Sequence, residues 1–249
     1  MVQNRMVAVC DILGFSDMVN THPLQEVIDN SLGYLSKAIY HSMKQEEFPN
    51  SAPILDQFQN QRQIGFAWFS DTVLLYAFDD EDHTNENLVE TAAWLLFETM
   101  VWDWSRLRVG VAYGEFLADE KAGIYVGKAM IDAYRLQCNQ DWSGGALTPS
   151  AANRLGVSHL SPEQTLHFLV NYPVPLKSEP ISPLSVAVDW TFGLHDFLPM
   201  PWSSQSPEPS AGELQRQPSV VRKWRNTKKF HETVCKSCHR EGMRSENAK

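Results

Sequence analysis

Two acidic residues in this chain stand where a carboxylate could take part in metal–phosphate chemistry, at the ends of predicted strands. Asp11 ends the apolar stretch of residues 5–11, which predicts a buried strand. Asp71 lies in the tight turn between residues 64–69 and 72–78, two apolar stretches that predict a β-hairpin. Either acid alone could simply cap a turn, so a metal site requires a fold that brings the two together.

The spacing of apolar residues predicts the elements that must position these acids. Residues 24–44 carry apolar side chains at helical intervals and predict a long amphipathic helix. The later predicted elements are a helix over residues 86–104, strands over 107–116 and 123–126, and a helix over 127–139. The order β-α-β-β-α-β, followed by a strand and a helix, is the ferredoxin-like arrangement of an α+β fold with an antiparallel sheet. Arg108, at the start of a strand, is expected to be a surface charge, and contact with a nucleotide through an inward-folded loop is the alternative.

In that arrangement the first strand and the hairpin are neighbours, so Asp11 and Asp71 are expected to lie close together. Two adjacent carboxylates repel each other unless a cation lies between them. Two Mg²⁺ or Mn²⁺ ions about 4 Å apart are a common device for phosphoryl displacement. Backbone N–H groups of residues 12–15, ahead of a helix start, could face a phosphate. Two unrelated turn acids on a plain ferredoxin-like domain remain the alternative, because a fold does not fix a function.

The composition is that of a globular chain with one sizeable core. Its 249 residues are 43% hydrophobic and carry a net charge of −9, and the mean hydropathy is −0.32. Runs of the roughly 20 apolar residues that cross a bilayer are absent, and an acid interrupts the N-terminal apolar stretch, so we expect a cytoplasmic protein without membrane partners. The four cysteines suggest reduced thiols, and the acidic charge argues against nonspecific nucleic-acid binding.

A change in composition divides the chain into a folded domain over residues 1–198, a Pro/Ser-rich linker over 199–218 and a basic tail over 219–249. The tail has nine Lys or Arg residues against three Asp or Glu, and a flexible, disordered segment is the favoured interpretation, with a short basic helix over 219–233 as the alternative. A zinc site is a further alternative, weakly indicated because only one CxxC pair is present. Its ligands would be His231, Cys235, Cys238 and His239.

Three motifs in this chain resemble the catalytic domain of the class III nucleotide cyclases, in order and over residues 6–155. VAVCDILGFSDMV, residues 7–19, is similar to the metal-binding opening of that family. FAWFSDTVLLY, residues 66–76, resembles its hairpin with the second metal-binding Asp. LRVGVAYGEF followed by YVGKAMIDAYRLQ resembles its later strand, glycine turn and helix. Several motifs in the correct order are more specific than any one alone.

The resemblance implies a role for individual residues. Asp11 and Asp71, with the backbone carbonyl of Ile12, match the ligands of two divalent cations, Mn²⁺ or Mg²⁺. Arg135 matches the arginine that stabilises charge on the reacting phosphate, and Lys177 resembles the late lysine that meets the triphosphate. Domains of this family dimerise head to tail, which implies a homodimer whose shared sites take the two acids from one chain and the arginine from the other. The backbone expected to bind phosphate belongs to Leu13, Gly14 and Phe15.

The sequence departs from this family where the family reads the base. Adenylate cyclases place a Lys, and guanylate cyclases a Glu, at the position of Ala67, while the partner Asp of adenine recognition falls at Ile124. The asparagine one turn before the arginine is replaced by Ile131. With both purine readers missing, the chain resembles the bacterial Pycsar pyrimidine cyclases, which implies conversion of UTP, or else CTP, to a 3′,5′-cyclic nucleotide in anti-phage defence. A purine cyclase with other base readers and a non-catalytic sensor are the alternatives.

Overall fold

The computed structural model describes most of the chain, and some expectations lie outside it. The described residues do not include the predicted end of the first helix, residues 43–44, or nearly all of the linker, residues 199–217. The side chains of residues 235–246 also lie outside the description, and three of the four candidate zinc ligands are among them. No helix in the described ranges is long and apolar enough to cross a membrane. These ranges are residues 2–42, 63–102, 106–157, 166, 168–178, 185–191 and 218–246.

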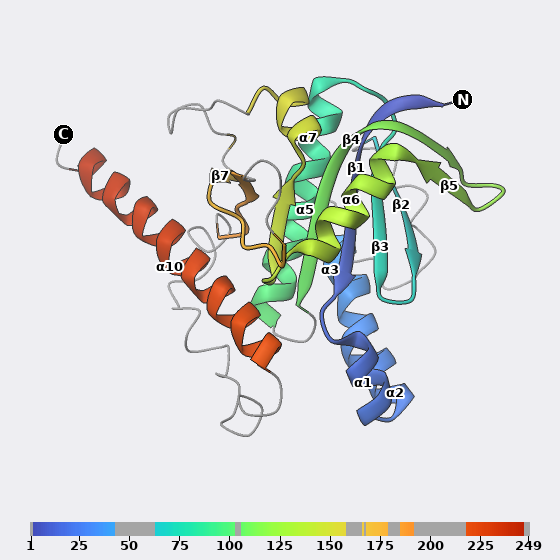
Figure 1. The fold of residues 1–249 in the computed structure, drawn as a ribbon, viewed down its shortest axis with the longest axis horizontal. Helices are drawn as coiled ribbons and strands as arrows, with labels where there is room; N and C mark the ends of the chain where they lie inside the picture. The colour runs from blue at the N-terminus through green and yellow to red at the C-terminus, as the bar shows by residue number, and fades with distance from the viewer. Residues whose placement is uncertain are drawn as a thin grey trace.

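The described residues form one eight-stranded sheet, in which the predicted α+β, ferredoxin-like order is confirmed (Figure 1). The strands run in the order β2-β3-β1-β4-β6-β8-β7, with β5 paired to β4. All pairings are antiparallel except that of β4 with β6. The strands are β1 (Gln3–Ile12), β2 (Ile64–Phe69), β3 (Thr72–Ala77), β4 (Leu107–Asp119), β5 (Ile124–Gly127), β6 (Gly144–Leu147), β7 (Leu169–Asn171) and β8 (Val186–Val188).

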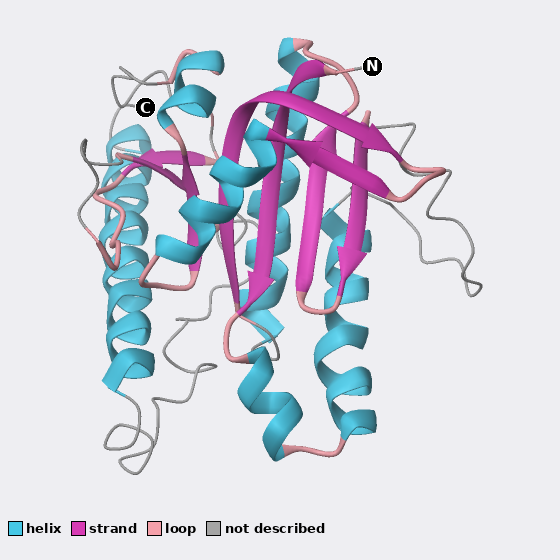
Figure 2. Cartoon of the chain, turned by 45° about the vertical axis from the view of Figure 1, so that its right-hand side comes forward, coloured by secondary structure: helices cyan, strands magenta, loops and turns pink. Residues whose placement is uncertain are grey.

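Helices cover both faces of this sheet, with α5 and α6 on opposite faces (Figure 2). Because side chains alternate along a strand, Met6 and Ala8 of β1 pack with the α3–α5 side, while Val7 and Val9 pack with α6. Gly110 lets α6 approach closely, since a Cβ there would lie 2.2 Å from the Ala133 carbonyl oxygen. The helices are α1 (Phe15–Thr21), α2 (Leu24–Glu26), the π-helix η1 (Val27–Leu32), α3 (Gly33–Ser42), α5 (Asp82–Trp102), α6 (Lys128–Asn139), α7 (Pro149–Arg154) and α10 (Pro218–Glu246).

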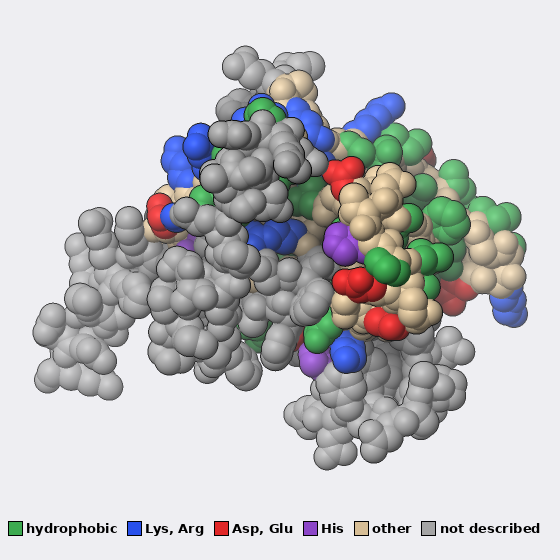
Figure 3. Space-filling view, turned by 90° about the horizontal axis from the view of Figure 1, so that it is seen from below, with side chains coloured by type: hydrophobic (Ala, Val, Ile, Leu, Met, Phe, Trp, Pro, Cys, Tyr) green, Lys and Arg blue, Asp and Glu red, His purple; other side chains and the backbone are tan. Residues whose placement is uncertain are grey.

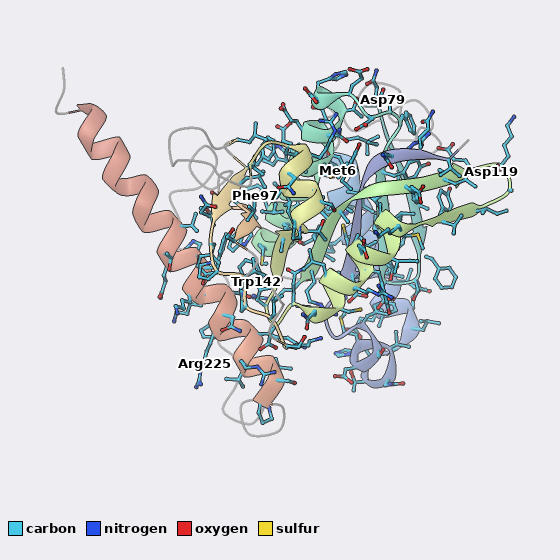
Figure 4. All side chains as sticks on the ribbon, turned by 45° about the horizontal axis from the view of Figure 1, so that its top comes forward. Met6, Asp79, Phe97, Asp119, Trp142 and Arg225 are labelled. Atoms are coloured by element: carbon cyan, nitrogen blue, oxygen red, sulfur yellow. The ribbon has the colours of Figure 1, made fainter. Side chains whose placement is uncertain are left out.

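The basic C-terminal segment differs from the predicted flexible tail, because residues 218–246 form the 29-residue helix α10. The first half of α10 packs against the body of the molecule, and Figure 4 shows Trp142 beside it. Phe230 is fully buried and meets the rings of Trp142 and Tyr172 edge-on, with centroids 4.9 and 4.8 Å away. Charge and proline content predict a boundary, but they do not reveal that the apolar side chains of α10 pack against the body.

The buried ring of Phe230 predicts that docking of α10 contributes to stability. We expect Phe230→Ala to lower the free energy of unfolding by about 3–5 kcal/mol, because it removes a large apolar side chain and leaves a cavity. Urea unfolding followed by circular dichroism measures this change. Lys229→Ala, at the exposed neighbouring position, is the control and should change stability little. Equal stability of the two variants would show that α10 does not dock as described.

Candidate functional site

The structure places Asp11 and Asp71 at adjacent positions, at the end of the sheet where β1 finishes and the β2–β3 hairpin turns (Figure 1). Asp11 lies opposite Thr72 in the antiparallel β1–β3 pair. The Ile12 N–H donates a hydrogen bond to the Asp71 carbonyl oxygen at 3.1 Å, which ties the turn to the end of β1. Both acids are therefore carried by backbone that the sheet holds in place.

The Asp11 carboxylate is bound by two side chains from neighbouring elements. Arg108 Nη2 and Gln137 Nε2 each donate a hydrogen bond to Asp11 Oδ2, both at 2.8 Å. The Arg108 side chain is only 12% exposed and that of Asp11 22%. The expectation that Arg108 is a surface charge is therefore wrong. Its position directly opposite Asp11 in the β1–β4 register explains the contact, and this register cannot be read from either strand alone.

The turn after Asp11 provides fewer free N–H groups than expected. The N–H groups of Ile12 and Leu13 donate to the carbonyl oxygens of Asp71 and Arg106, at 3.1 and 2.8 Å, so they are not available to a phosphate. The expected phosphate contacts of this segment therefore fall to Gly14 and Phe15 at the start of α1. Gly14 has a φ of 77°, a left-handed conformation that favours glycine, and nothing lies within 4 Å of where its Cβ would be.

Asp11 and Asp71 alone provide too few ligands for a hard divalent cation, so oxygen atoms of the substrate would have to complete its coordination. Arg108 and Gln137 both bind Oδ2 of Asp11, which leaves Oδ1 for a metal ion. Within the described part of the chain, no group of three or more His, Cys, Asp or Glu side chains gathers to hold a metal. Mg²⁺ is commonly held by one or two carboxylates together with water and substrate phosphates, so the Asp11–Asp71 pair fits that mode.

Arg135 lies on α6, away from Asp11 of its own chain. Its side chain is 75% exposed and pairs with Asp132 at 3.9 Å. Gln137 faces Asp11, and Arg135, two residues earlier, points about 160° away around the helix. Arg135 instead lines a largely apolar cavity of about 740 Å³. The other lining residues are Val9, Ala67, Trp68, Phe69, Thr72, Leu74, Gly123, Tyr125, Met130, Ile131 and Tyr134.

The remaining expected nucleotide contacts are divided between two places. Ala67 lines the cavity with Arg135, whereas Ile124 is half-exposed on β5 and only its neighbours Gly123 and Tyr125 reach the cavity. Lys177 lies on the Asp11 side, because its amine donates to the Cys138 carbonyl oxygen at 2.5 Å. Arg108 Nη1 approaches the same oxygen at 3.5 Å. The structure thus groups Asp11, Arg108 and Lys177, with Asp71 in the adjoining turn, whereas Arg135 lines the cavity.

Because the Arg108 guanidinium binds the Asp11 carboxylate, we predict that Arg108 competes with a metal ion for this carboxylate. We expect Arg108→Met to bind Mn²⁺ about tenfold more tightly, since a charge-assisted hydrogen bond to the same carboxylate is removed. Titration of Mn²⁺ followed by electron paramagnetic resonance, without nucleotide, measures this affinity. Lys128→Met, which removes an exposed cation from the start of α6, should leave it unchanged. Unaltered or weaker binding by Arg108→Met would argue against Asp11 as a metal ligand.

Comparison with known proteins identifies the fold. No protein-family model and no curated protein sequence matches this chain. Among solved structures, the chain is similar to the guanylyl cyclase Cya2, with 12% identity, a TM-score of 0.51 and coverage of 76% of this chain and 92% of that one. It is also similar to the catalytic core of a rhodopsin-guanylyl cyclase with converted specificity in complex with ATPαS, with 11% identity, a TM-score of 0.51 and coverage of 75% and 96%.

A third structure agrees with these two. A bacterial light-regulated adenylyl cyclase has 14% identity and a TM-score of 0.50, and the match covers 76% of this chain but 52% of that one. At such identities the likeness shows the fold and does not transfer a substrate. The sheet order, the Asp11–Asp71 end of the sheet and these neighbours together show that this chain has the α+β fold of the class III nucleotide cyclases.

Proposed function

We propose that this chain is a nucleotide cyclase, which converts a nucleoside triphosphate to a 3′,5′-cyclic nucleotide and pyrophosphate. The observation that carries the proposal is the adjacency of Asp11 and Asp71 at one end of a class III cyclase fold. In the reaction, the ribose 3′-hydroxyl releases its proton to water and its oxygen forms a bond to the α-phosphorus, while the bond from that phosphorus to the β-phosphate oxygen breaks. Pyrophosphate leaves with the electron pair of that bond.

The residues at this end of the sheet suit that reaction. Asp11 and Asp71, with the Ile12 carbonyl, would hold two Mg²⁺ or Mn²⁺ ions, which supply Lewis-acid activation of the 3′-hydroxyl and neutralise triphosphate charge. The N–H groups of Gly14 and Phe15 would face phosphate oxygens at the start of α1. Arg135 would stabilise the negative charge that builds on the α-phosphate, where a fixed guanidinium is most effective.

The direction of Arg135 supports a head-to-tail homodimer with shared sites. Arg135 points away from Asp11 of its own chain, so it would serve the acids of a second chain. Large apolar side chains stand exposed around the cavity that Arg135 lines, among them Phe69 at 84%, Tyr134 and Ile131. Aromatic and apolar side chains of this kind are typical of the core of an interface. Facing copies would close this cavity and bring each Arg135 to the other chain's metal-binding acids.

The substrate we favour is UTP, with CTP second. Ala67 and Ile124 carry no hydrogen-bonding group with which to read a purine edge, and the cavity beside Ala67 is lined mainly by apolar and aromatic side chains. Together with the resemblance to pyrimidine cyclases of anti-phage defence, this favours a cytoplasmic enzyme that makes cyclic UMP. A purine cyclase with other base readers is the second candidate, because the similar structures are guanylyl and adenylyl cyclases.

Incubation of the full-length protein with Mn²⁺ and each of the four nucleoside triphosphates, with products identified by mass spectrometry, tests the proposal. We expect cyclic UMP as the main product and at least about a hundredfold less of it from Asp71→Ala, because a metal ligand is lost. Glu81→Ala removes an exposed acid and should retain activity. Cyclic GMP or cyclic AMP as the main product would favour the purine alternative, and no product from any triphosphate would favour a non-catalytic protein.

A further inference from the structure

A lysine of α10 faces the body of the molecule close to the candidate site. The Thr227 side chain is buried, and its hydroxyl oxygen accepts a hydrogen bond from the Ser143 N–H at 2.8 Å. Lys223 lies one helical turn earlier, on the same face of α10. The Thr227 hydroxyl also donates to the Lys223 carbonyl oxygen at 2.9 Å. Lys223 therefore faces the body, whereas Arg225 points outward in Figure 4.

The part of the body that receives Lys223 is the end of α6. Asp141 accepts hydrogen bonds from the Arg222 guanidinium through both carboxylate oxygens, and its carbonyl oxygen accepts from the Asn226 amide at 2.8 Å. The Asp141 N–H donates to the Pro175 carbonyl oxygen, and the Lys177 N–H donates to that of Asn139, at 2.9 and 2.7 Å. Lys223 and Lys177 thus reach the same end of α6 from two different segments.

Arg108 is the third cation at this place. Ser143, which holds Thr227 on α10, also donates from its hydroxyl to the Leu107 carbonyl oxygen at 2.9 Å, so α10 is tied to the start of β4. Arg108 and Lys177 share the Cys138 carbonyl oxygen as acceptor. Arg108 also reaches Asp11. Arg108 and Lys177 therefore lie together beside the acid proposed to bind metal, and α10 brings Lys223 near enough for its charge to interact with both.

The charges around Lys223 leave this group with an excess of positive charge. Four cationic side chains gather here, Arg108, Lys177, Arg222 and Lys223, against the carboxylates of Asp11 and Asp141 and that of Asp71 in the adjoining turn, and Arg222 already engages Asp141. Burial lowers the pKa of Lys223, and the charges of Arg108 and Lys177 lower it further. Figure 3, which views the molecule from below, shows Lys and Arg side chains on the left and elsewhere on this face, with several Asp and Glu side chains to the right of its centre. Such an excess is suited to an anionic ligand.

We propose that Lys223 of α10, together with Arg108 and Lys177, binds the polyphosphate group of the substrate, so that the C-terminal helix is part of the active site. Lysine is a compact point charge suited to phosphate, and the guanidinium of Arg108 adds planar donors. All three cations belong to the chain that carries Asp11 and Asp71. The identity of the ligand rests on the proposed nucleotide cyclase function, while the anion site itself rests on the arrangement of the side chains.

Inorganic tripolyphosphate in buffer with EDTA is the probe, because it tests the cations without bound metal or a nucleoside. Calorimetric titration of the full-length protein should show binding that Lys223→Met weakens about tenfold, the loss expected for one hydrogen bond to a charged group. Lys223→Arg should restore most of the affinity. Lys229→Met removes an exposed lysine from the same helix and should leave the affinity unchanged. Lys177→Met, on a separate segment, should weaken binding as Lys223→Met does.

The outcomes separate this inference from the proposed function. Absence of tripolyphosphate binding by the wild-type protein, or equal affinity of Lys223→Met and Lys229→Met, would overturn the polyphosphate site even if a nucleoside triphosphate is cyclised. Weaker binding by Lys223→Met and by Lys177→Met, but not by Lys229→Met, would support it even if no triphosphate is cyclised. Circular dichroism of each variant checks that α10 stays helical, and Lys177→Met supplies the same test without a change in α10.

Discussion

The antiparallel register of β1 between β3 and β4 is the constraint on which the rest of the site depends. It sets Asp11 opposite Thr72 on one side and opposite Arg108 on the other, so Asp11 lies beside the turn that carries the second acid and contacts a cation. A slip of one residue would turn Asp11 to the other face of the sheet, because side chains alternate along a strand. Core packing on both faces of β1 opposes such a slip, since Met6 and Ala8 fill one cluster and Val7 and Val9 the other. The hydrophobic core thereby fixes the position of the charges.

Electrostatic balance explains why this end of the sheet collects elements that are distant in the sequence. The Asp11–Asp71 pair concentrates negative charge on rigid backbone, and the protein counters it with Arg108 from β4 and the amide of Gln137 from α6. Lys177 and α10 then add positive charge around the end of α6. Although the chain has a net charge of −9, cationic side chains lie beside the acids at this place. A metal–triphosphate complex bound there would contact charges of both signs.

The sequence was sufficient for the parts of the fold that depend on local periodicity. Apolar runs and helical spacing predicted β1, the β2–β3 hairpin, α5, β4 and α6, although α5 begins at Asp82, earlier than residue 86. Strands β6, β7 and β8 were not predicted, because three or four residues carry too little pattern to recognise. At the site, the adjacency of Asp11 and Asp71 followed from the order of elements. The contact of Arg108 with Asp11 and the docking of Phe230 could not be predicted in this way. Both depend on strand register and on contacts between residues far apart in the sequence.

In the proposed homodimer, two chains complete each other's sites, with Asp71 from one chain and Arg135 from the other. Mixing two inactive variants, Asp71→Ala and Arg135→Ala, tests it most directly. Random pairing makes half of the dimers mixed, and each mixed dimer has one intact site of two, so the mixture should regain about a quarter of wild-type cyclase activity. Persistent inactivity of a mixture in which heterodimers are demonstrated by native mass spectrometry would contradict the shared site.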